Sequence, residues 1–291
     1  MFNNEEIPNI IVTGGCGFIG SHFTERLLDE GFCVTVVDDK RQGDWVIPHP
    51  NVKYYFEDVA NFNPFRGEIT PPVAIFHLAN SPRVRRSLER PTETIVNNIA
   101  STAAVADWAR IMNCRLFFAT SSSTQYSDSD NPYTWSKANC EDLLELYHRL
   151  YQLDYSKLYF YSVYGPGEAD YGEYSTVIRC FKKNYLQNKP LQVFGTGKKE
   201  RDFTHVYDVV QGLIQLLADE NAPKIVHFGK GSPRRIKDIA EAFDHPIINA
   251  FDQPGEAQKT LCKTPYIECP TEVIAYIKDW VKRNHNRSKD D

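Results

Sequence analysis

Residues 13–20 read TGGCGFIG, directly after the apolar run at 10–12 and directly before a stretch with the pattern of a helix. Gly14, Gly17 and Gly20 have the spacing of a dinucleotide-binding turn. In such a turn one glycine allows the sharp bend, the next lets a diphosphate approach the backbone, and the last lets the helix pack on the strand. The N–H groups at the start of the helix then attract the anion. Because glycine triplets also occur in turns without a ligand, the pattern needs a second element to support it.

That second element follows at the expected distance. Residues 34–37, VTVV, are predicted to form the next strand, which ends at Asp38, eighteen positions after Gly20. An acidic side chain at this place can hydrogen-bond the ribose hydroxyls of an adenosine, and it repels a 2′-phosphate. The sequence therefore favours NAD over NADP, although Arg41 close by weakens that preference.

The composition is that of an ordinary globular protein. The chain has 291 residues, of which 42% are hydrophobic and 24% charged, and its formal net charge is −5. We expect no general attraction to nucleic acid or to a membrane surface, no membrane span and no signal peptide. The seven cysteines are scattered and include no Cys-x-x-Cys pair. We therefore expect a cytoplasmic protein with reduced thiols and with no metal site.

The first half of the chain alternates between strand-like and helix-like segments, which is typical of an α/β doubly wound parallel sheet. Strands are predicted at 10–13, 33–37, 52–56, 73–78, 115–120, 155–161, 191–194 and 225–228. Helices are predicted at 18–30, 92–112, 134–152, 174–187, 205–218, 236–243 and 271–283. We expect a Rossmann-type NAD-binding domain over 1–164. Over 165–291 we expect mainly a smaller C-terminal substrate-binding lobe, with some segments returning to the main sheet.

Two segments carry candidate catalytic side chains. Tyr133 and Lys137 lie four positions apart at the start of a predicted helix, so both project from one face. The strand before them runs into SSSTQY at 121–126, hydroxyl groups at the carboxyl end of a strand, where ligands bind in open α/β sheets. A tyrosine is a base at neutral pH only when its phenolate is stabilised, which a lysine ammonium and a positively charged nicotinamide ring can do.

With these motifs in this order, the chain resembles the extended short-chain dehydrogenase/reductases, and among them the NAD-dependent nucleotide-sugar epimerase/dehydratase family. The resemblance covers nearly the whole chain. It continues in FHLA at 76–79, VYGPG at 163–167, PLQVFGTG at 190–197 and RDFTHV at 201–206. It implies an enzyme that holds NAD and acts on a nucleotide-sugar.

The resemblance also implies roles for the matching residues. Tyr133 would be the general base, Lys137 its activator, and Ser122 the hydroxyl partner, because Ser122 lies four positions before Tyr126; Ser123 is the second candidate. Asp58 and Val59 would contact the adenine, Ala79 the nicotinamide, and Asn98 would support the site from a neighbouring helix. The implied cofactor-binding residues are Gly14, Gly17, Phe18, Ile19, Gly20, Asp38, Asp58, Val59, Leu78, Ala79, Asn98, Tyr133 and Lys137. The implied substrate-binding residues are Ser123, Ser162, Arg85 and Arg201.

Two of these residues have structural alternatives. Arg201 would grip the diphosphate of the sugar nucleotide, or it forms a surface ion pair with Asp202 or Glu200. His77 is expected to be a packed histidine at a strand end, and not a catalytic residue.

The reaction is inferred mainly from what is absent. The family's 4,6-dehydratases carry Thr-Asp-Glu where this chain has hydroxyls at 122–124, and its glucuronate decarboxylases place a glutamate at the position of Thr124. What remains is 4-epimerisation, and the closest resemblance is to UDP-sugar 4-epimerases. An NAD(P)H-dependent reductase of a nucleotide-linked 4-keto sugar uses the same residues and stays open, as does a non-catalytic NAD-binding regulatory protein.

Three departures from the family pattern concern the substrate. The loop at 127–132 is short, Ser162 stands where an asparagine is usual, and Gln253 replaces the arginine of an Arg-Pro-Gly-Asp segment. Lys199, Arg234 and Arg235 are candidates for the missing cation.

The helices predicted at 92–112 and 134–152 have apolar residues on more than one face. These include Ile95, Ile99, Ala103, Leu143, Leu146 and Leu150. The family commonly pairs the two helices with their copies in a four-helix bundle, so we expect a homodimer. The alternative is burial of these residues against the sheet of the same chain.

Overall fold

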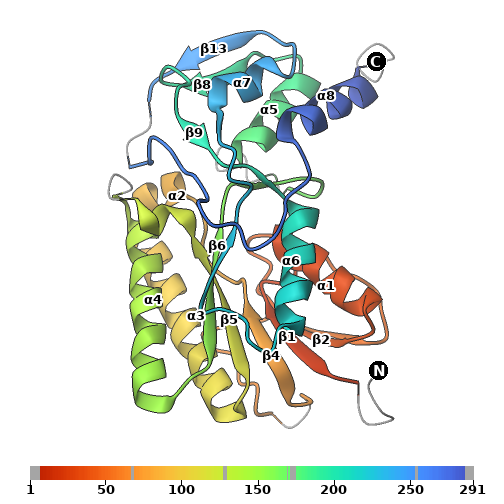
Figure 1. The fold of residues 1–291 in the computed structure, drawn as a ribbon, viewed down its shortest axis with the longest axis vertical. Coiled ribbons are helices and arrows are strands. Elements are labelled where there is room, and N and C mark those ends of the chain that lie inside the picture. Colours follow the sequence, from red (N-terminus) through yellow and green to blue (C-terminus); the bar gives the residue numbers. More distant parts are fainter. Residues whose placement is uncertain are drawn as a thin grey trace.

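The computed structural model describes residues 7–66, 69–126, 130–168, 170, 175–252 and 255–285. Its main body is a seven-stranded parallel sheet with the order β11-β6-β5-β4-β1-β2-β3 (Figure 1). The strands are β1 (Asn9–Thr13), β2 (Cys33–Val37), β3 (Val52–Tyr55), β4 (Pro72–His77), β5 (Arg115–Ser121), β6 (Tyr155–Phe160) and β11 (Ile225–Phe228). The order of the first six strands is that of the Rossmann fold, which confirms the predicted fold class.

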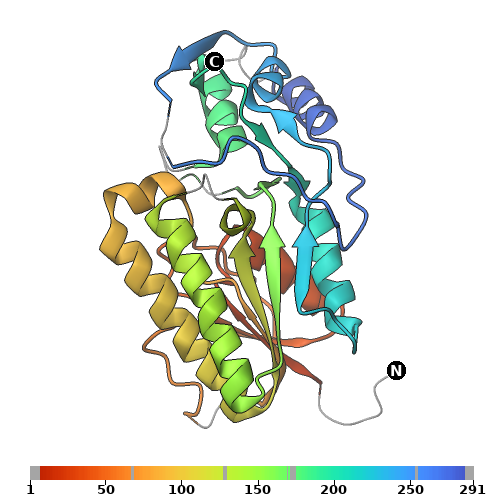
Figure 2. The same ribbon diagram turned by 60° about the vertical axis from the view of Figure 1, so that its left-hand side comes forward.

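Helices cover both faces of the sheet (Figures 1 and 2). Helices α1 (Phe18–Asp29) and α6 (Val206–Ala218) pack on one face, and α3 (Pro91–Met112) and α4 (Pro132–Tyr151) pack on the other. In β1 all five residues are buried, with Ile10 facing α1 and α6 and Ile11 facing α3 and α4. A strand that is covered on both sides has no polar face, which is why these segments read as unbroken apolar runs.

The remaining elements form a smaller region beyond the carboxyl ends of the strands (Figure 2). It contains α5 (Val177–Leu186), α7 (Ile236–Glu241), α8 (Val273–Asn284) and the parallel pair β8 (Leu191–Phe194) and β13 (Ile247–Ala250). Its own hydrophobic cluster includes Phe181, Phe243 and Ile277, each at most 1% exposed. Helix α6 and strand β11 come from the second half of the chain but lie in the main body.

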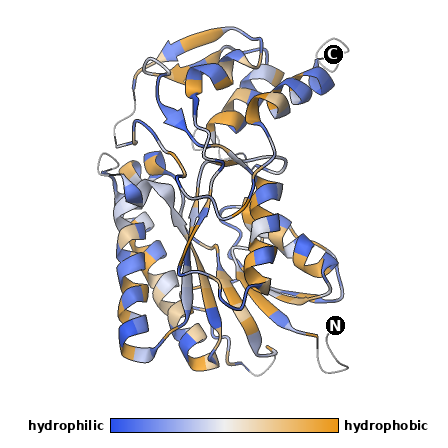
Figure 3. Cartoon of the chain, in the orientation of Figure 1, coloured by the Kyte–Doolittle hydropathy of each residue, from blue (hydrophilic) through white to orange (hydrophobic). Residues whose placement is uncertain are grey.

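Short strand pairs connect the two parts. β7 (Val163–Tyr164) pairs with β10 (Thr204–His205), and β9 (Glu200–Arg201) pairs with β12 (Arg234–Arg235). Figure 3 shows that hydrophobic segments run through the sheet and the smaller region, while bands of hydrophilic residues follow α4. Among the helices of the described residues, none is both long and apolar enough to cross a membrane.

The predicted elements are present, with differences at their ends. α4 begins at Pro132 because proline suits the first turn of a helix and the Asn131 side chain caps it, accepting a hydrogen bond from the Thr134 N–H. The helix predicted from 174 begins at Val177, and residue 174 lies outside the described residues. The prediction missed helix α2 (Val84–Glu89), the 3₁₀ turn η1 (Ser122–Gln125), β13 and the two-residue strands β7, β9, β10 and β12.

Candidate active site

A cavity of about 550 Å³ lies between the carboxyl ends of the main strands and the smaller region. Its walls come from the β1–α1 turn, from the segments after β2, β4 and β5, and from α5, β8 and β9. All the site residues predicted from the sequence line this cavity except Asn98. Segments that are far apart in the chain are thus brought to one place.

The backbone segments of the glycine turn lie so close together that a side chain would not fit at Gly14 or Gly20. Gly14 has a φ of +76°, and a Cβ there would lie 2.6 Å from the backbone nitrogen of Ala79. A Cβ on Gly20 would lie 2.1 Å from the carbonyl oxygen of Gly14. Helix α1 starts directly after Gly17, which provides no side-chain cap. Its first N–H groups therefore face the cavity without a side-chain acceptor, as a diphosphate requires.

Asp38 lies at the end of β2 with its carboxylate held in place. One oxygen accepts a hydrogen bond from the Cys16 N–H at 2.9 Å, and the other accepts one from the Lys40 N–H at 2.7 Å. Burial raises the pKa of Asp38, and these two backbone donors oppose that rise. The carboxylate is thus fixed at the cavity wall, where it could accept hydrogen bonds from ribose hydroxyls.

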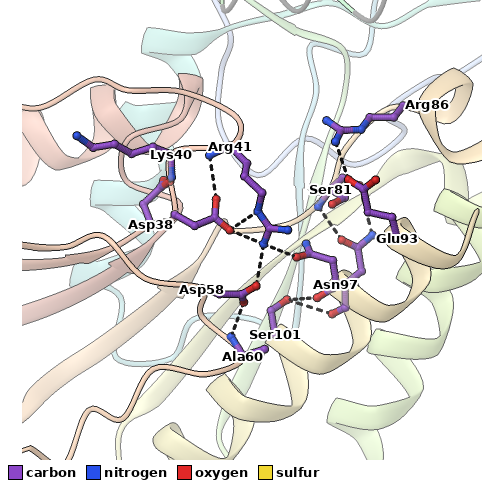
Figure 4. Close-up of polar contacts among 12 residues, drawn as sticks. Asp38, Lys40, Arg41, Asp58, Ala60, Ser81, Arg86, Glu93, Asn97 and Ser101 are labelled. Carbon is purple, nitrogen blue, oxygen red and sulfur yellow. Dashed lines mark hydrogen bonds and ion pairs between the residues drawn. The ribbon is translucent and has the colours of Figure 1, made fainter. Parts of the chain in front are cut away.

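Arg41 is fully engaged with neighbouring side chains (Figure 4). Its guanidinium donates to Asp58 Oδ2 at 2.8 Å and to Asn97 Oδ1 at 3.0 Å, and its Nε donates to Asp39 Oδ2 at 2.5 Å. The hydrogen bond to Asp39 contributes most to the raised pKa of Arg41. Because its charge is neutralised by two carboxylates, Arg41 does not offer an open cation to a 2′-phosphate beside Asp38.

Tyr133 stands in the first turn of α4, half-buried and facing the cavity. Burial raises the pKa of its phenol, while a hydrogen bond with the Ser121 side chain and the positive charge of Arg83 lower it. Lys137 is 2% exposed, and its Nζ donates to the carbonyl oxygen of Ala119 at 2.5 Å. Burial lowers the pKa of Lys137 to about 8.

The Ser121 side chain lowers the pKa of the Tyr133 phenol, which indicates that its hydroxyl lies close to that of Tyr133. Ser121 Oγ lies 2.9 Å from Ser123 Oγ, which also accepts a hydrogen bond from Thr134 Oγ1 at 3.0 Å. Ser122 also lines the cavity. It is predicted from its spacing to Tyr126, and that spacing does not show that β5 continues to Ser121. The structure therefore adds Ser121 to the predicted pair of serines.

The described carboxylates of the cavity follow β2 and β3 or are held in ion pairs. Those among its described lining residues are Asp38, Asp39, Asp58, Glu93 and Glu256. The three aspartates follow β2 and β3, Glu93 pairs with Arg86 at 2.6 Å, and Glu256 pairs with Arg201 at 3.0 Å. Thr124, at the position of the family's acid, donates instead to Glu141 at 3.0 Å.

Arg201 has a different ion-pair partner from the two considered from the sequence. Its guanidinium donates to Glu256, to the carbonyl oxygen of Glu200 at 2.9 Å and to that of Ala257 at 2.8 Å. The side chain is 15% exposed and lines the cavity. Asp202 is fully buried and accepts hydrogen bonds from backbone N–H groups, not from Arg201.

Two residues lie behind the cavity wall. The Asn98 amide accepts from the Ser81 N–H at 2.7 Å and donates to Ser136 Oγ at 2.9 Å, so it holds the loop after β4 and does not line the cavity. His77 is fully buried between Thr13 and Thr102, and burial lowers its pKa to about 3. It has the environment of a packed histidine.

The departures from the family pattern are placed as follows. Residues 127–129 and Gln253 lie outside the described residues. Ser162 lines the cavity. Of the three candidate cations, Lys199 lines the cavity, whereas Arg234 and Arg235 do not.

The sequence has relatives over most of its length. It is 26% identical over 306 residues to a putative UDP-glucose 4-epimerase of Methanocaldococcus jannaschii, which covers 95% of this chain and 99% of the relative. It is 31% identical over 264 residues to a UDP-glucuronate 4-epimerase of Thermodesulfobacterium geofontis, which covers 81% of this chain and 80% of the relative. A UDP-N-acetyl-alpha-D-glucosaminuronate decarboxylase of Bacillus cytotoxicus is 29% identical, over 79% of this chain and 78% of the relative.

Solved structures share the fold. A UDP-glucose 4-epimerase of Thermotoga maritima, solved with UDP-glucose, superposes with a TM-score of 0.86 at 24% identity and covers 96% of this chain and 99% of that one. A UDP-glucuronic acid 4-epimerase of Bacillus cereus, in complex with UDP-glucuronic acid and NAD, has a TM-score of 0.81 at 22% identity, over 94% and 99%. The profile of one family matches residues 10–229. The chain therefore belongs to the NAD dependent epimerase/dehydratase family.

Proposed function

We propose that this protein is an NAD-dependent nucleotide-sugar epimerase that inverts C4 of a UDP-hexose through a transient 4-keto sugar. The observation that carries the proposal is one cavity lined by the glycine turn, Asp38, Ser121, Tyr133 and Lys137. Relatives named as 4-epimerases that span most of the chain support it.

The residues fit NAD at one end of the cavity. The glycine turn and the start of α1 would hold its diphosphate, Asp38 its adenosine ribose, and Asp58 and Val59 would line the adenine pocket. NAD is favoured over NADP because Asp38 is fixed where a 2′-phosphate would lie and Arg41 is already paired.

When bound, NAD supplies the acceptor and donor of a hydride at C4. Tyr133 takes the proton of the C4 hydroxyl and returns it after the bound 4-keto sugar has rotated to present its other face. Ser121 forms a hydrogen bond with the same oxygen. Lys137 uses one of its three N–H donors on Ala119, which leaves two for the ribose of the nicotinamide. Its ammonium group then keeps the phenolate accessible near neutral pH.

The alternatives are less well supported by the same geometry. Elimination of water needs a base at C5 and an acid at the hydroxyl of C6, and the described carboxylates of the cavity either follow β2 and β3 or are held in ion pairs. A reductase that exchanges NADPH needs a cation for the 2′-phosphate, and Arg41 is not available for that role.

The test is to purify the protein, release its bound nucleotide, and follow UDP-glucose, UDP-glucuronate and UDP-N-acetylglucosamine by NMR. We expect stoichiometric NAD and an equilibrium mixture of C4 epimers from one of these sugars without added cofactor. An empty site, no epimerisation of these sugars, and reduction of a nucleotide-linked 4-keto sugar with added NADPH would instead establish the reductase.

We also propose that α3 and α4 form a homodimer. Large apolar side chains on these two helices are exposed in the single chain: Val96 is 59% exposed, Ile111 53%, Trp135 52% and Leu150 60%. Pairing of both helices with their copies would bury this surface. A mass of one chain by light scattering would contradict the dimer.

A further inference from the structure

The loop between β4 and α2 carries polar side chains that have no partner. Asn80 Oδ1, Asn80 Nδ2 and Arg83 Nε are buried, and none of them has a hydrogen bond within the described chain. Asn80 and Arg83 both line the cavity. Because a buried polar atom without a partner is costly, such atoms in a cavity wall indicate where a ligand supplies the missing hydrogen bonds.

Arg83 also differs from the other cations of the cavity. Each of the other arginines and lysines that line it has a partner in the chain: Arg41 with Asp58, Arg85 with Glu89, Arg86 with Glu93, Lys137 with the Ala119 carbonyl, Lys199 with Asp252, and Arg201 with Glu256. For Arg83, no carboxylate within the described ranges lies at ion-pair distance. Its charge is therefore the one in this part of the cavity that lacks a counter-ion among the described residues.

The backbone at Arg83 is held in an unfavourable conformation. Its φ is +94°, a region that long side chains seldom adopt. Strain of this kind persists only where surrounding structure enforces it, and it concentrates at ligand sites. The conformation of the loop that carries Arg83 is held by Asn98, whose amide accepts a hydrogen bond from the Ser81 N–H and donates one to the Ser81 carbonyl oxygen.

The surroundings of Arg83 place it at the reacting end of the sugar. Its positive charge lowers the pKa of the Tyr133 phenol from α4 and of the Cys180 thiol from α5, in each case against the larger effect of burial. Tyr133 acts on the C4 hydroxyl. In a hexose C6 is bonded to C5, the direct neighbour of C4, whereas the diphosphate is attached to C1 across the ring. Arg83 and Tyr133 line the same cavity. Of the groups near C4 in a hexose, the one at C6 is the one that can be a carboxylate, so a cation near Tyr133 is matched in charge to a C6 carboxylate.

We propose that Asn80 and Arg83 form a subsite for a C6 carboxylate, so that the preferred substrate is a nucleotide-linked uronate and not a neutral hexose. The Arg83 guanidinium donates to the carboxylate as a charged, two-pronged donor, and Asn80 Nδ2 adds a further hydrogen bond. Asn80 Oδ1 remains to accept from a sugar hydroxyl. This inference rests on the proposed 4-epimerase function, because it takes C4 to lie at Tyr133.

The test compares kcat/KM for UDP-glucuronate and UDP-glucose in the wild type, in Arg83→Gln and in Arg83→Lys. We expect the wild type to prefer the uronate by roughly 100-fold or more, and Arg83→Gln to lose at least about tenfold of that preference. Arg83→Lys should fall between them because it keeps the charge but not the fork of donors. Arg26→Gln is the matched control, since Arg26 pairs with Glu30 at the far end of α1 and should keep the wild-type preference.

Binding is measured in parallel on Tyr133→Phe protein, with and without Arg83→Gln, by calorimetry with both sugars. Nearly equal Kd values for the two sugars in the Tyr133→Phe protein with Arg83 intact would overturn the carboxylate subsite. So would an equal loss on both sugars in Arg83→Gln, because Arg83 would then bind a group common to both, the diphosphate. In either case 4-epimerisation of UDP-glucose would leave the proposed function standing. Absence of turnover with every UDP-sugar would count against that function, and the Kd ratio would still decide the subsite.

Discussion

The two ends of the cavity differ in how their polar groups are used. At the cofactor end, Asp38 already holds two backbone N–H groups and Arg41 already holds two carboxylates. At the sugar end, Asn80 and Arg83 have buried polar atoms without partners in the described chain. Under the proposed function, the end that would hold NAD has its polar groups already paired, as suits a cofactor that stays bound. The end that would hold the sugar has polar groups that a substrate would pair when it binds.

Replacing Tyr133 by phenylalanine should have the largest effect, because it should abolish turnover while leaving cofactor binding intact. Without the phenol no group takes the C4 proton, so kcat should fall by roughly 10³-fold or more, while NAD stays bound. Turnover and released nucleotide are measured on the same preparation. Tyr185→Phe, in the smaller region, is the control. Wild-type rates in Tyr133→Phe would remove Tyr133 from the mechanism.

Gly20→Ala should disrupt the cofactor end. The new Cβ would lie 2.1 Å from the Gly14 carbonyl oxygen, so the turn must open, and we expect NAD content to fall by about 100-fold, as for a loss of about 2–3 kcal/mol. Gly31→Ala is the matched control. Gly31 has a φ of +87°, but its Cβ would have nothing within 4 Å, so this variant should lose about 1 kcal/mol of stability and keep its NAD. Retention of NAD by Gly20→Ala would show that the turn adapts.

Asp38→Ala should weaken NAD binding by roughly 10- to 100-fold, because a charged acceptor for the ribose hydroxyls is lost. It should also narrow the preference for NAD over NADP, since the repulsion of a 2′-phosphate disappears. Both affinities can be measured by fluorescence titration of nucleotide-free protein. An unchanged NAD:NADP ratio would place the adenosine ribose elsewhere.

The pH dependence should be the smallest effect, a change of a few-fold. The pKa of Lys137 is lowered to about 8, so its positive charge is present below that pH and is lost as the pH rises through it. Because the Tyr133 phenolate needs this charge, kcat/KM should decline above about pH 8. Lys137→Arg keeps its charge at high pH, so whatever activity it retains should lack the decline. A wild-type profile that still rises at pH 9 would contradict this role.

The residues predicted to bind the cofactor could be selected from the sequence because their signals are local. The spacing of Gly14, Gly17 and Gly20 and the strand that ends at Asp38 are readable along the chain, and the structure brings them together. Missed elements such as α2 and β13 are short, with six and four residues, and their residues show no clear period.

The sugar end could not be predicted in the same way. Ser121 is not among the predicted site residues, because the predicted strand ends at 120 and β5 extends one residue further before η1 begins. Arg83 stands in a row with Arg85 and Arg86, and nothing in the sequence distinguishes it from them. In the structure Arg85 pairs with Glu89 one turn further along α2, and Arg86 pairs with Glu93 of α3.

The return of α6 and β11 to the main body limits how such a protein can be rebuilt. A single cut after residue 164 would leave β6 with an exposed edge and α1 without the helix packed beside it. Exchange of substrate specificity by grafting therefore requires at least two separate inserts, one on each side of α6 and β11. Recombination at one crossover point would yield chimaeras that lack part of the sheet.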